Sequence, residues 1–188
     1  MPVVASRRPS GAWCAPAQRD AAVPAHTRSV KLVLRLATRH DALPIARMSR
    51  DFIERGLGWI WTPLRVARSI AAADTNVIVA ASPVVATPLG FGIMRYGDEE
   101  AHLLLLAVDP VVRRHGVGAA LVAWLEGSAR AAGVGPVYLE ARASNAQARA
   151  FYRRLGYGEI QRLPGYYGGV EASVRMAKDL WHVPASSA

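Results

Sequence analysis

The residues with the clearest chemical potential lie in a basic, glycine-containing turn from Arg113 to Gly118. The turn follows an apolar run, Leu103–Val108, that stops at Asp109-Pro110, and an amphipathic segment with helical spacing begins directly after it. A strand–turn–helix unit of this kind directs several unpaired backbone N–H groups at one point. The helix dipole and two arginines add positive charge there, and glycine lets a ligand approach the backbone. The pattern therefore predicts a pyrophosphate site.

The residues after the turn narrow the identity of the phosphate ligand. A Walker A loop needs a Lys-Ser/Thr pair after its last glycine, where this chain has Ala119-Ala120. A dinucleotide fingerprint needs a third glycine at the position of Leu121. The sequence therefore fits neither a Walker A loop nor a dinucleotide-binding fingerprint. The remaining alternative to a phosphate site is an ordinary strand–helix turn whose arginines are only solvated.

A second group of functional residue types lies between Tyr138 and Tyr157. This stretch closely resembles the C-terminal half of enzymes of the GNAT acetyltransferase superfamily, and of the RimI-type protein N-terminal acetyltransferases in particular. In those enzymes a strand ends in Leu-Glu-x-Arg, Ser-Asn opens the next helix, and an aromatic-Tyr pair precedes Leu-Gly-aromatic. The matching residues are Leu139, Glu140, Arg142, Ser144, Asn145, Phe151, Tyr152, Leu155, Gly156 and Tyr157. The turn, as Arg113-x-x-Gly116-x-Gly118, resembles the family's acyl-CoA signature, and the resemblance covers about residues 31–180.

The resemblance implies an N-acetyltransferase that moves an acetyl group from acetyl-CoA to a primary amine. It implies that Glu140 is the general base, acting either directly or through a water molecule, and that Tyr152 is the general acid for the sulfur of coenzyme A. The alternatives are that Glu140 only pairs with Arg142 or Arg149, and that Tyr152 is a core tyrosine with a satisfied hydroxyl.

The resemblance also implies how acetyl-CoA is bound. The backbone of the strand before the turn would pair with the pantetheine arm and polarise the acetyl carbonyl. The turn would hold the pyrophosphate, although His115 within it is also interpreted as a solvated turn residue, and Asn145 would contact the cofactor arm. The expected cofactor-binding residues are Leu106, Ala107, Val108, Arg113, Arg114, His115, Gly116, Val117, Gly118, Ala119 and Asn145.

The acceptor is the least determined part of the prediction. RimI-type enzymes carry a tyrosine pair in the loop between the last two strands, and Tyr166 and Tyr167 stand at the matching place. Trp59 and Trp61 either line the acceptor cleft or fill the edge of the core. Pro164-Gly165 departs from the family pattern before the tyrosine pair. A protein N-terminal α-amine and a small-molecule amine therefore both stay open, beside a non-catalytic acyl-CoA-binding domain of the same fold.

The single cysteine, Cys14, bears on the mechanism. An acyl-cysteine route needs a positioned thiol, and Cys14 lies in the N-terminal extension. We therefore expect direct attack by the amine in a ternary complex. The histidines form no ligand pair at helical or turn spacing, so no metal is expected.

The elements that must position these residues alternate between strand and helix signals. We expect helices from Thr38 or Asp41 to Arg55, from Thr62 as N-cap to Ala73, from Gly116 to Ala132, and from Asn145 as N-cap to Leu155, with Gly156 at C′. Expected strands are Leu32–Leu36, Asn76–Ala81, Phe91–Tyr96, Ala101–Val108, Val137–Ala141, Gly158–Leu163 and Ala172–Lys178. This order predicts one α/β (α+β) domain at 31–182, with a central mixed, mostly antiparallel sheet of six to seven strands and helices on both faces.

Composition adds limits to this prediction. The 188 residues carry a net charge of +9, with 21 Arg and 2 Lys, so anionic partners are favoured. The arginines are spread along the chain without interleaved aromatic residues, which disfavours nucleic acid. Residues 1–30 are expected to be a disordered extension and 183–188 a tail. The uncharged segment Thr75–Met94 is interrupted by prolines and glycines, which disfavours a membrane span. We expect a cytoplasmic protein, monomeric or homodimeric.

Overall fold

The computed structural model describes residues 32–83 and 85–182, and the expected extension (1–30) and tail (183–188) lie outside this part. The elements in chain order are β1 (Val33–Leu36), the 3-10 helix η1 (Arg39–Asp41), α1 (Ala42–Phe52), α2 (Pro63–Ala71), β2 (Thr75–Ser82), β3 (Val85–Tyr96), β4 (Ala101–Val108), the 3-10 helix η2 (Pro110–Val112), α3 (Val117–Ala131), β5 (Pro136–Arg142), α4 (Ala146–Arg154), β6 (Gly158–Tyr167) and β7 (Glu171–Asp179). The strands of this part form one sheet in the order β1-β2-β3-β4-β5-β7-β6. Among them, β4 and β5 are the single parallel pair. The predicted mixed, mostly antiparallel sheet is confirmed.

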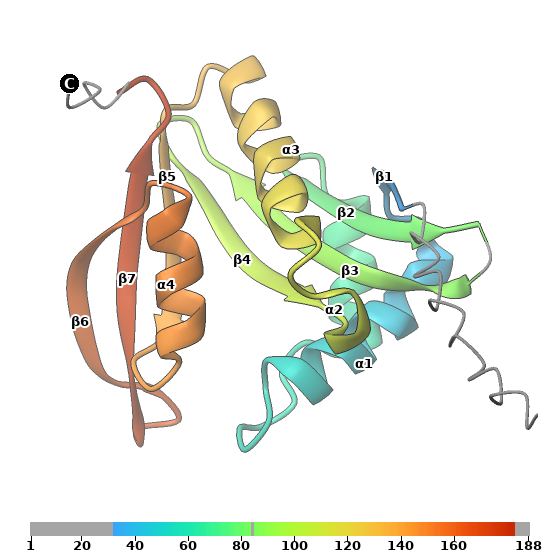
Figure 1. The fold of residues 1–188 in the computed structure, drawn as a ribbon, viewed down its shortest axis with the longest axis horizontal. Helices are drawn as coiled ribbons and strands as arrows, with labels where there is room; N and C mark the ends of the chain where they lie inside the picture. The colour runs from blue at the N-terminus through green and yellow to red at the C-terminus, as the bar shows by residue number, and fades with distance from the viewer. Residues whose placement is uncertain (1–31, 84, 183–188) are drawn as a thin grey trace, which may run out of the picture.

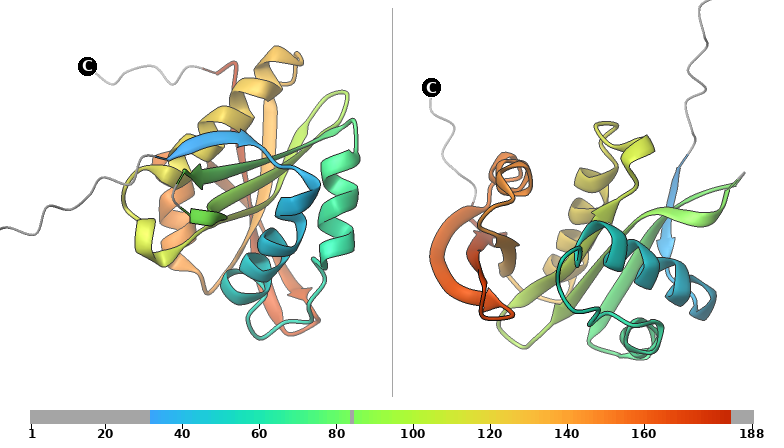
Figure 2. Two further views of the ribbon diagram at one scale, coloured as in Figure 1. Left: turned by 90° about the vertical axis from the view of Figure 1, so that its right-hand side faces the viewer. Right: turned by 90° about the horizontal axis from the view of Figure 1, so that it is seen from below.

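Helices cover both faces of the sheet, as expected (Figures 1 and 2). α1 and α2 pack on one face, where Ile45 and Val66 join strand residues such as Phe91 in one apolar cluster. α3 and α4 pack on the other face, where Leu121 and Tyr152 belong to a second, larger cluster. In the described part of the chain, no helix is long and apolar enough to cross a membrane.

Strand β4 changes the face on which its side chains lie halfway along its length. Leu103 packs in the cluster under α3, whereas Leu105 packs in the cluster under α1 and α2. The pairing with β3 explains the change, because Ile93 lies opposite Leu105 while the next residue, Met94, lies opposite Leu103. Leu104 is therefore an extra residue on β4. It forms a β-bulge, which bends the strand.

The sheet opens beyond this bulge. β4 pairs with β5 only where Ala101–Leu103 lie opposite Val137–Leu139, and Figure 1 shows the two strands diverging from there. We call β1–β4 with α1–α3 the N-terminal half, and β5–β7 with α4 the C-terminal half. The last residues of β4 have no strand partner on the side that faces the gap between the halves.

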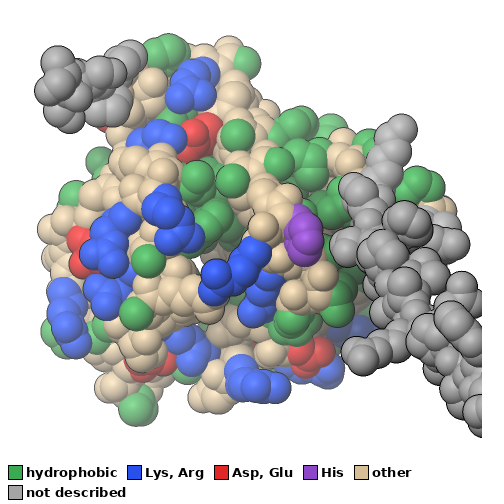
Figure 3. All heavy atoms as spheres, viewed as in Figure 1, with side chains coloured by type: hydrophobic (Ala, Val, Ile, Leu, Met, Phe, Trp, Pro, Cys, Tyr) green, Lys and Arg blue, Asp and Glu red, His purple; other side chains and the backbone are tan. Residues whose placement is uncertain are grey.

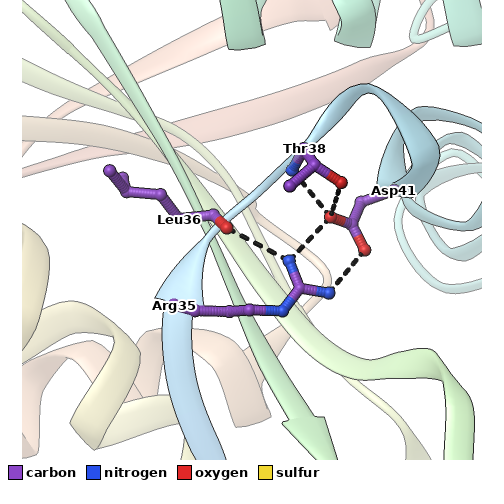
Figure 4. Close-up of polar contacts among 4 residues, drawn as sticks. All are labelled: Arg35, Leu36, Thr38 and Asp41. Atoms are coloured by element: carbon purple, nitrogen blue, oxygen red, sulfur yellow. Dashed lines mark hydrogen bonds and ion pairs between the residues drawn. The ribbon is translucent and has the colours of Figure 1, made fainter.

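A carboxylate fixes the connection from β1 to α1 (Figure 4). The guanidinium of Arg35 donates to both carboxylate oxygens of Asp41, over 2.8 and 2.9 Å. The backbone N–H and hydroxyl of Thr38 donate to Oδ2 of Asp41 over 2.7 and 3.0 Å. Burial by itself would raise the pKa of Asp41, but the hydrogen bonds from Arg35 and Thr38 hold that pKa below its usual value.

The predicted N-caps of α2 and α4 are confirmed. Oγ1 of Thr62 accepts from the N–H of Arg65 at α2, with Pro63 as the first helical residue, and Oδ1 of Asn145 accepts from the N–H of Ala148 at α4. Gly156 follows the C-cap of α4 with a φ of 91°, as expected for a C′ glycine.

Several element ends differ from the prediction. α1 stops at Phe52 instead of Arg55, with Ile53 as its C-cap. β3 begins six residues earlier than predicted, because Val85 already pairs with Ser82. β6 continues to Tyr167, because a turn with two positive-φ glycines lets pairing resume between Tyr167 and Glu171. The tyrosine pair therefore lies at the end of a strand and not in a loop.

Candidate active site

The turn before α3 presents backbone donors, as the sequence predicts. Gly116 is the N-cap of α3 and has a φ of 78°, and Arg114 has a φ of 63°, so both are in the left-handed region. The first hydrogen bond of the helix runs from the N–H of Ala120 to the carbonyl of Gly116. The N–H groups of residues 114–119 have no acceptor within the described part of the chain. Such a cluster at a helix N-terminus fits an anionic group.

These donors line a cavity of about 610 Å³ between α3, α4 and the end of β4. Ten of the eleven predicted cofactor-binding residues border this cavity, namely Leu106, Ala107, Val108, Arg113, Arg114, Gly116, Val117, Gly118, Ala119 and Asn145. His115 does not border it. Its Nδ1 lies 2.8 Å from the carbonyl oxygen of Arg113, so the ring stays within the turn. Figure 3 shows Lys and Arg side chains gathered around a hollow on this face of the molecule.

The end of β4 supplies the other wall of the cavity. The N–H of Asp109 bonds to Leu89 on β3, and N–H directions alternate along an antiparallel strand. The N–H groups of Leu106 and Val108 therefore point toward the gap, while that of Ala107 points toward β3. On the open side, Nε of Arg113 donates to the carbonyl of Val108 over 2.9 Å. These free strand amides fit an extended chain with amide groups, such as a pantetheine arm.

Tyr152 borders the same cavity from α4. Its ring packs edge-on against Phe151 and Tyr157, with centroids 5.1 and 5.7 Å apart. Burial, and then the nearby Tyr167, raise the pKa of Tyr152 above its usual value. The phenol therefore keeps its proton at neutral pH. Its hydroxyl donates to no acceptor within residues 32–83 and 85–182, so the proton is available to a ligand in the cavity.

Glu140 lies on the opposite face of the sheet, beside the gap. Its Oε2 is 2.6 Å from Nε2 of His102 on β4, and its Oε1 is 3.3 Å from Nε of Arg175 on β7. The pairing with Arg142 or Arg149 that was considered from the sequence is wrong. Those arginines pair with Glu171 and Glu159 instead. The carboxylate is 9% exposed and is joined to both halves of the sheet.

The tyrosine pair lies near this carboxylate. Burial raises the pKa of both phenols, and the charge of Glu140 raises both further. Burial, Tyr166 and Glu140 together raise the pKa of Tyr167 to about 12. Tyr167 is also close enough to Tyr152 to raise its pKa. Tyr167 is thus close enough to interact electrostatically with both Tyr152 and Glu140.

The two tryptophans occupy different environments. Trp59 is 40% exposed, with its indole N–H donating to the carbonyl of Trp61 over 3.1 Å. Trp61 packs against the cluster under α1 and α2, with Arg65 over its ring at 4.3 Å. Neither borders the cavity. The carboxylate of Glu54 holds their loop, accepting from the N–H groups of Ile60 and Trp61 over 2.7 and 3.1 Å.

Comparison with known proteins agrees with this geometry. The chain matches the sequence profile of the acetyltransferase (GNAT) family over residues 47–157, more than half of its length. The chain belongs to this family. It is 40% identical over 90 residues to the ribosomal protein bS18-alanine N-acetyltransferase of Escherichia coli strain K12, a match that covers 46% of this chain and 61% of that relative. The chain therefore matches less than two thirds of that relative's length.

Solved structures share the GNAT fold. Ard1 from Thermoplasma volcanium superposes with a TM-score of 0.69 and 25% identity, covering 80% of this chain and 99% of that one. The ribosomal-protein-S18-alanine N-acetyltransferase from Escherichia coli gives a TM-score of 0.69 and 24% identity, covering 84% and 99%.

Sequence reasoning missed two partners of Glu140 in this GNAT domain. His102 is the one polar residue of the strand Ala101–Val108, and that position in an otherwise apolar strand was the available signal. Arg175 could not be found without the register that sets it opposite Glu140. Within the residues described, no three His, Cys, Asp or Glu side chains come together in a way that could hold a metal ion.

Proposed function

We propose that this protein is an acetyl-CoA-dependent N-acetyltransferase that acts on the α-amine of a protein N-terminus in the cytoplasm. One observation carries the proposal: a cavity with free amides and a protonated phenol lies on one face of the sheet beside the gap between β4 and β5, and a carboxylate 2.6 Å from a histidine lies on the other face. Family membership supports the reaction class, and the activity named for the Escherichia coli relative supports the acceptor.

Different residues of the cavity would bind different parts of acetyl-CoA. The N–H groups of residues 114–119 and the guanidinium of Arg114 would hold the pyrophosphate. The N–H groups of Leu106 and Val108 would hold the pantetheine arm. When bound there, acetyl-CoA supplies an acetyl group activated as a thioester. Tyr152, from the cavity wall, would donate its phenolic proton to the departing sulfur.

The acceptor amine would reach the gap from the face that carries Glu140. An N-terminal α-amine has a pKa of about 7.7–8.0, so a large share is protonated at neutral pH and must lose a proton before it attacks. Glu140 would take that proton, and His102 would act as a positioning residue that fixes the carboxylate through the 2.6 Å contact. Because acceptor and acetyl donor approach from opposite faces, both can be bound at once. This arrangement supports direct attack, without an acyl group on Cys14, which lies outside the described residues.

The experiment that tests the acceptor uses the full-length protein, acetyl-CoA and three sets of acceptors. These are ribosomal-protein-like peptides with a free N-terminus, the same peptides with a blocked N-terminus, and small primary amines with free amino acids. We expect coenzyme A release and a mass gain of one acetyl group only with the first set. A preference for small amines would overturn the peptide acceptor. Acetyl-CoA binding without turnover of any acceptor would identify a non-catalytic domain.

A further inference from the structure

Arg142, at the last position of β5, bridges segments that are far apart in the sequence. One terminal nitrogen, Nη2, donates to the carbonyls of Ile53 and Arg55 over 2.9 and 3.0 Å. The other, Nη1, lies 3.2 Å from Oε2 of Glu171. The guanidinium also lies 5.7 Å from the ring centroid of Tyr167. One side chain therefore contacts the end of α1, the start of β7 and the tyrosine pair.

The contact with α1 has a clear physical basis. Ile53 is the C-cap of α1, so its carbonyl belongs to the set that a helix leaves without an internal partner. A cation at this end also interacts favourably with the helix dipole. Arg142 is 22% exposed at its side chain and satisfies the two carbonyls from the other side of the gap. The segment that follows leads to Trp59 and Trp61.

The position of Arg142 matters because the two halves of the sheet are joined by few strand pairs. β4 and β5 pair over three residues at one end of the gap. At that closed end, Nζ of Lys178 on β7 also donates to Glu126 on α3, over 2.8 and 2.9 Å. Arg142 lies at the open end, three residues beyond Leu139, the last residue of β5 that pairs with β4. Its hydrogen bonds to the carbonyls of Ile53 and Arg55, directly after α1, span the gap there.

We propose that Arg142, together with Glu171, is a clamp that sets the width of the acceptor side of the gap. It holds the segment after α1 and the β6–β7 hairpin at a fixed position relative to Glu140, which lies two residues earlier on the same face of β5. Ser144 completes the clamp by donating its hydroxyl to Oε1 of Glu171. This inference rests on the proposed function for its consequence, the positioning of the acceptor. The existence of the clamp depends only on the contacts of Arg142 and not on the proposed function.

The test compares Arg142→Met with Arg149→Met. Arg149 is a matched control because it also pairs with a glutamate, Glu159 at 3.1 Å, with similar exposure, but it joins α4 to β6 within the C-terminal half. We expect Arg142→Met to raise the KM for the acceptor about tenfold through loss of positioning, with the KM for acetyl-CoA close to that of the control. Arg142→Lys should rescue little, because a single ammonium cannot reproduce the planar fork of guanidinium donors. Glu171→Gln should have an intermediate effect.

A readout independent of catalysis keeps the clamp and the proposed function separate. Hydrogen–deuterium exchange of residues 53–61 should be faster in Arg142→Met than in Arg149→Met, whether or not any acceptor is acetylated. Equal exchange in the two variants would overturn the clamp. Faster exchange with an unchanged acceptor KM, or with both KM values raised equally, would overturn its positioning role. If Arg142→Met does not fold, hydrogen–deuterium exchange and both KM values are compared between Arg149→Met and the milder variants Arg142→Lys and Glu171→Gln.

Discussion

Replacing Glu140 by glutamine removes the proposed proton acceptor while leaving the shape of the site nearly unchanged. The amide oxygen of the new side chain can still accept from Nε2 of His102, which lies 2.6 Å from the carboxylate. The amide cannot take a proton from an ammonium group. The substitution therefore separates the chemical role of the side chain from its role in packing.

The size of the effect follows from these contacts. A general base contributes about 10²–10⁴-fold to a rate, and Glu140→Gln keeps the positioning contact, so we expect kcat to fall about 10³-fold, or about 4 kcal/mol. Stability should change much less, because a neutral hydrogen bond replaces a charge-assisted one at a cost of about 1 kcal/mol. That corresponds to a fall of about 2–4 °C in Tm for a domain of this size.

The assay measures coenzyme A release against acceptor concentration, with acetyl-CoA affinity determined separately by calorimetry. Glu159→Gln is the control, because it also neutralises a carboxylate that is paired with an arginine, over 3.1 Å. Glu159 borders no part of the cavity. A kcat for Glu140→Gln equal to that of the control would refute the assignment of Glu140 as the base. Loss of acetyl-CoA binding in Glu140→Gln would show that the carboxylate acts through the fold instead.

Three further predictions concern the cavity and the stability of the domain. Tyr152→Phe should lower kcat about 10²-fold without lowering Tm, because the hydroxyl has no partner among the described residues; an unchanged kcat would contradict its role as the acid. Gly118→Val should abolish acetyl-CoA binding, because its Cβ would lie 3.2 Å from Phe151 Cζ at the cavity wall, whereas Gly127→Val on the same helix has open space and should still bind. Asp41 has a lowered pKa in the folded state, so its stabilisation is present above its unfolded pKa of about 3.9 and is lost as pH falls through the lower folded value. Denaturant unfolding should show Asp41→Asn less stable than wild type at pH 7, with the difference shrinking in acid; a constant difference would contradict the linkage.

The fold and the cavity could be predicted because their signals are local. An apolar strand, a glycine turn and an amphipathic helix follow one another directly, so the sequence from Leu103 to Leu125 contains the strand, the turn and the helix that build one wall of the cavity. The caps Thr62 and Asn145 were likewise visible, because capping acts within three residues.

The partners of Glu140 could not be predicted, because they depend on register between distant segments. The parallel register of β4 and β5 brings His102 to the carboxylate, and the antiparallel register of β5 and β7 brings Arg175 to it. Arg142 illustrates the same limit. Its motif was recognisable, but its contacts with Ile53 and Arg55 lie 89 and 87 positions away in the chain. No local pattern encodes such a distance.

The proposed function is tested most directly by measuring whether the full-length protein transfers an acetyl group from acetyl-CoA to a peptide α-amine. Thiol release and the intact mass of the peptide should be followed in the same reaction. We expect one free thiol of coenzyme A to appear for each acetylated N-terminus. The rate of this reaction should be almost completely lost in Glu140→Gln and in Tyr152→Phe. Thiol release without acetylated peptide, or equal rates in wild type and both variants, would contradict the proposed enzyme.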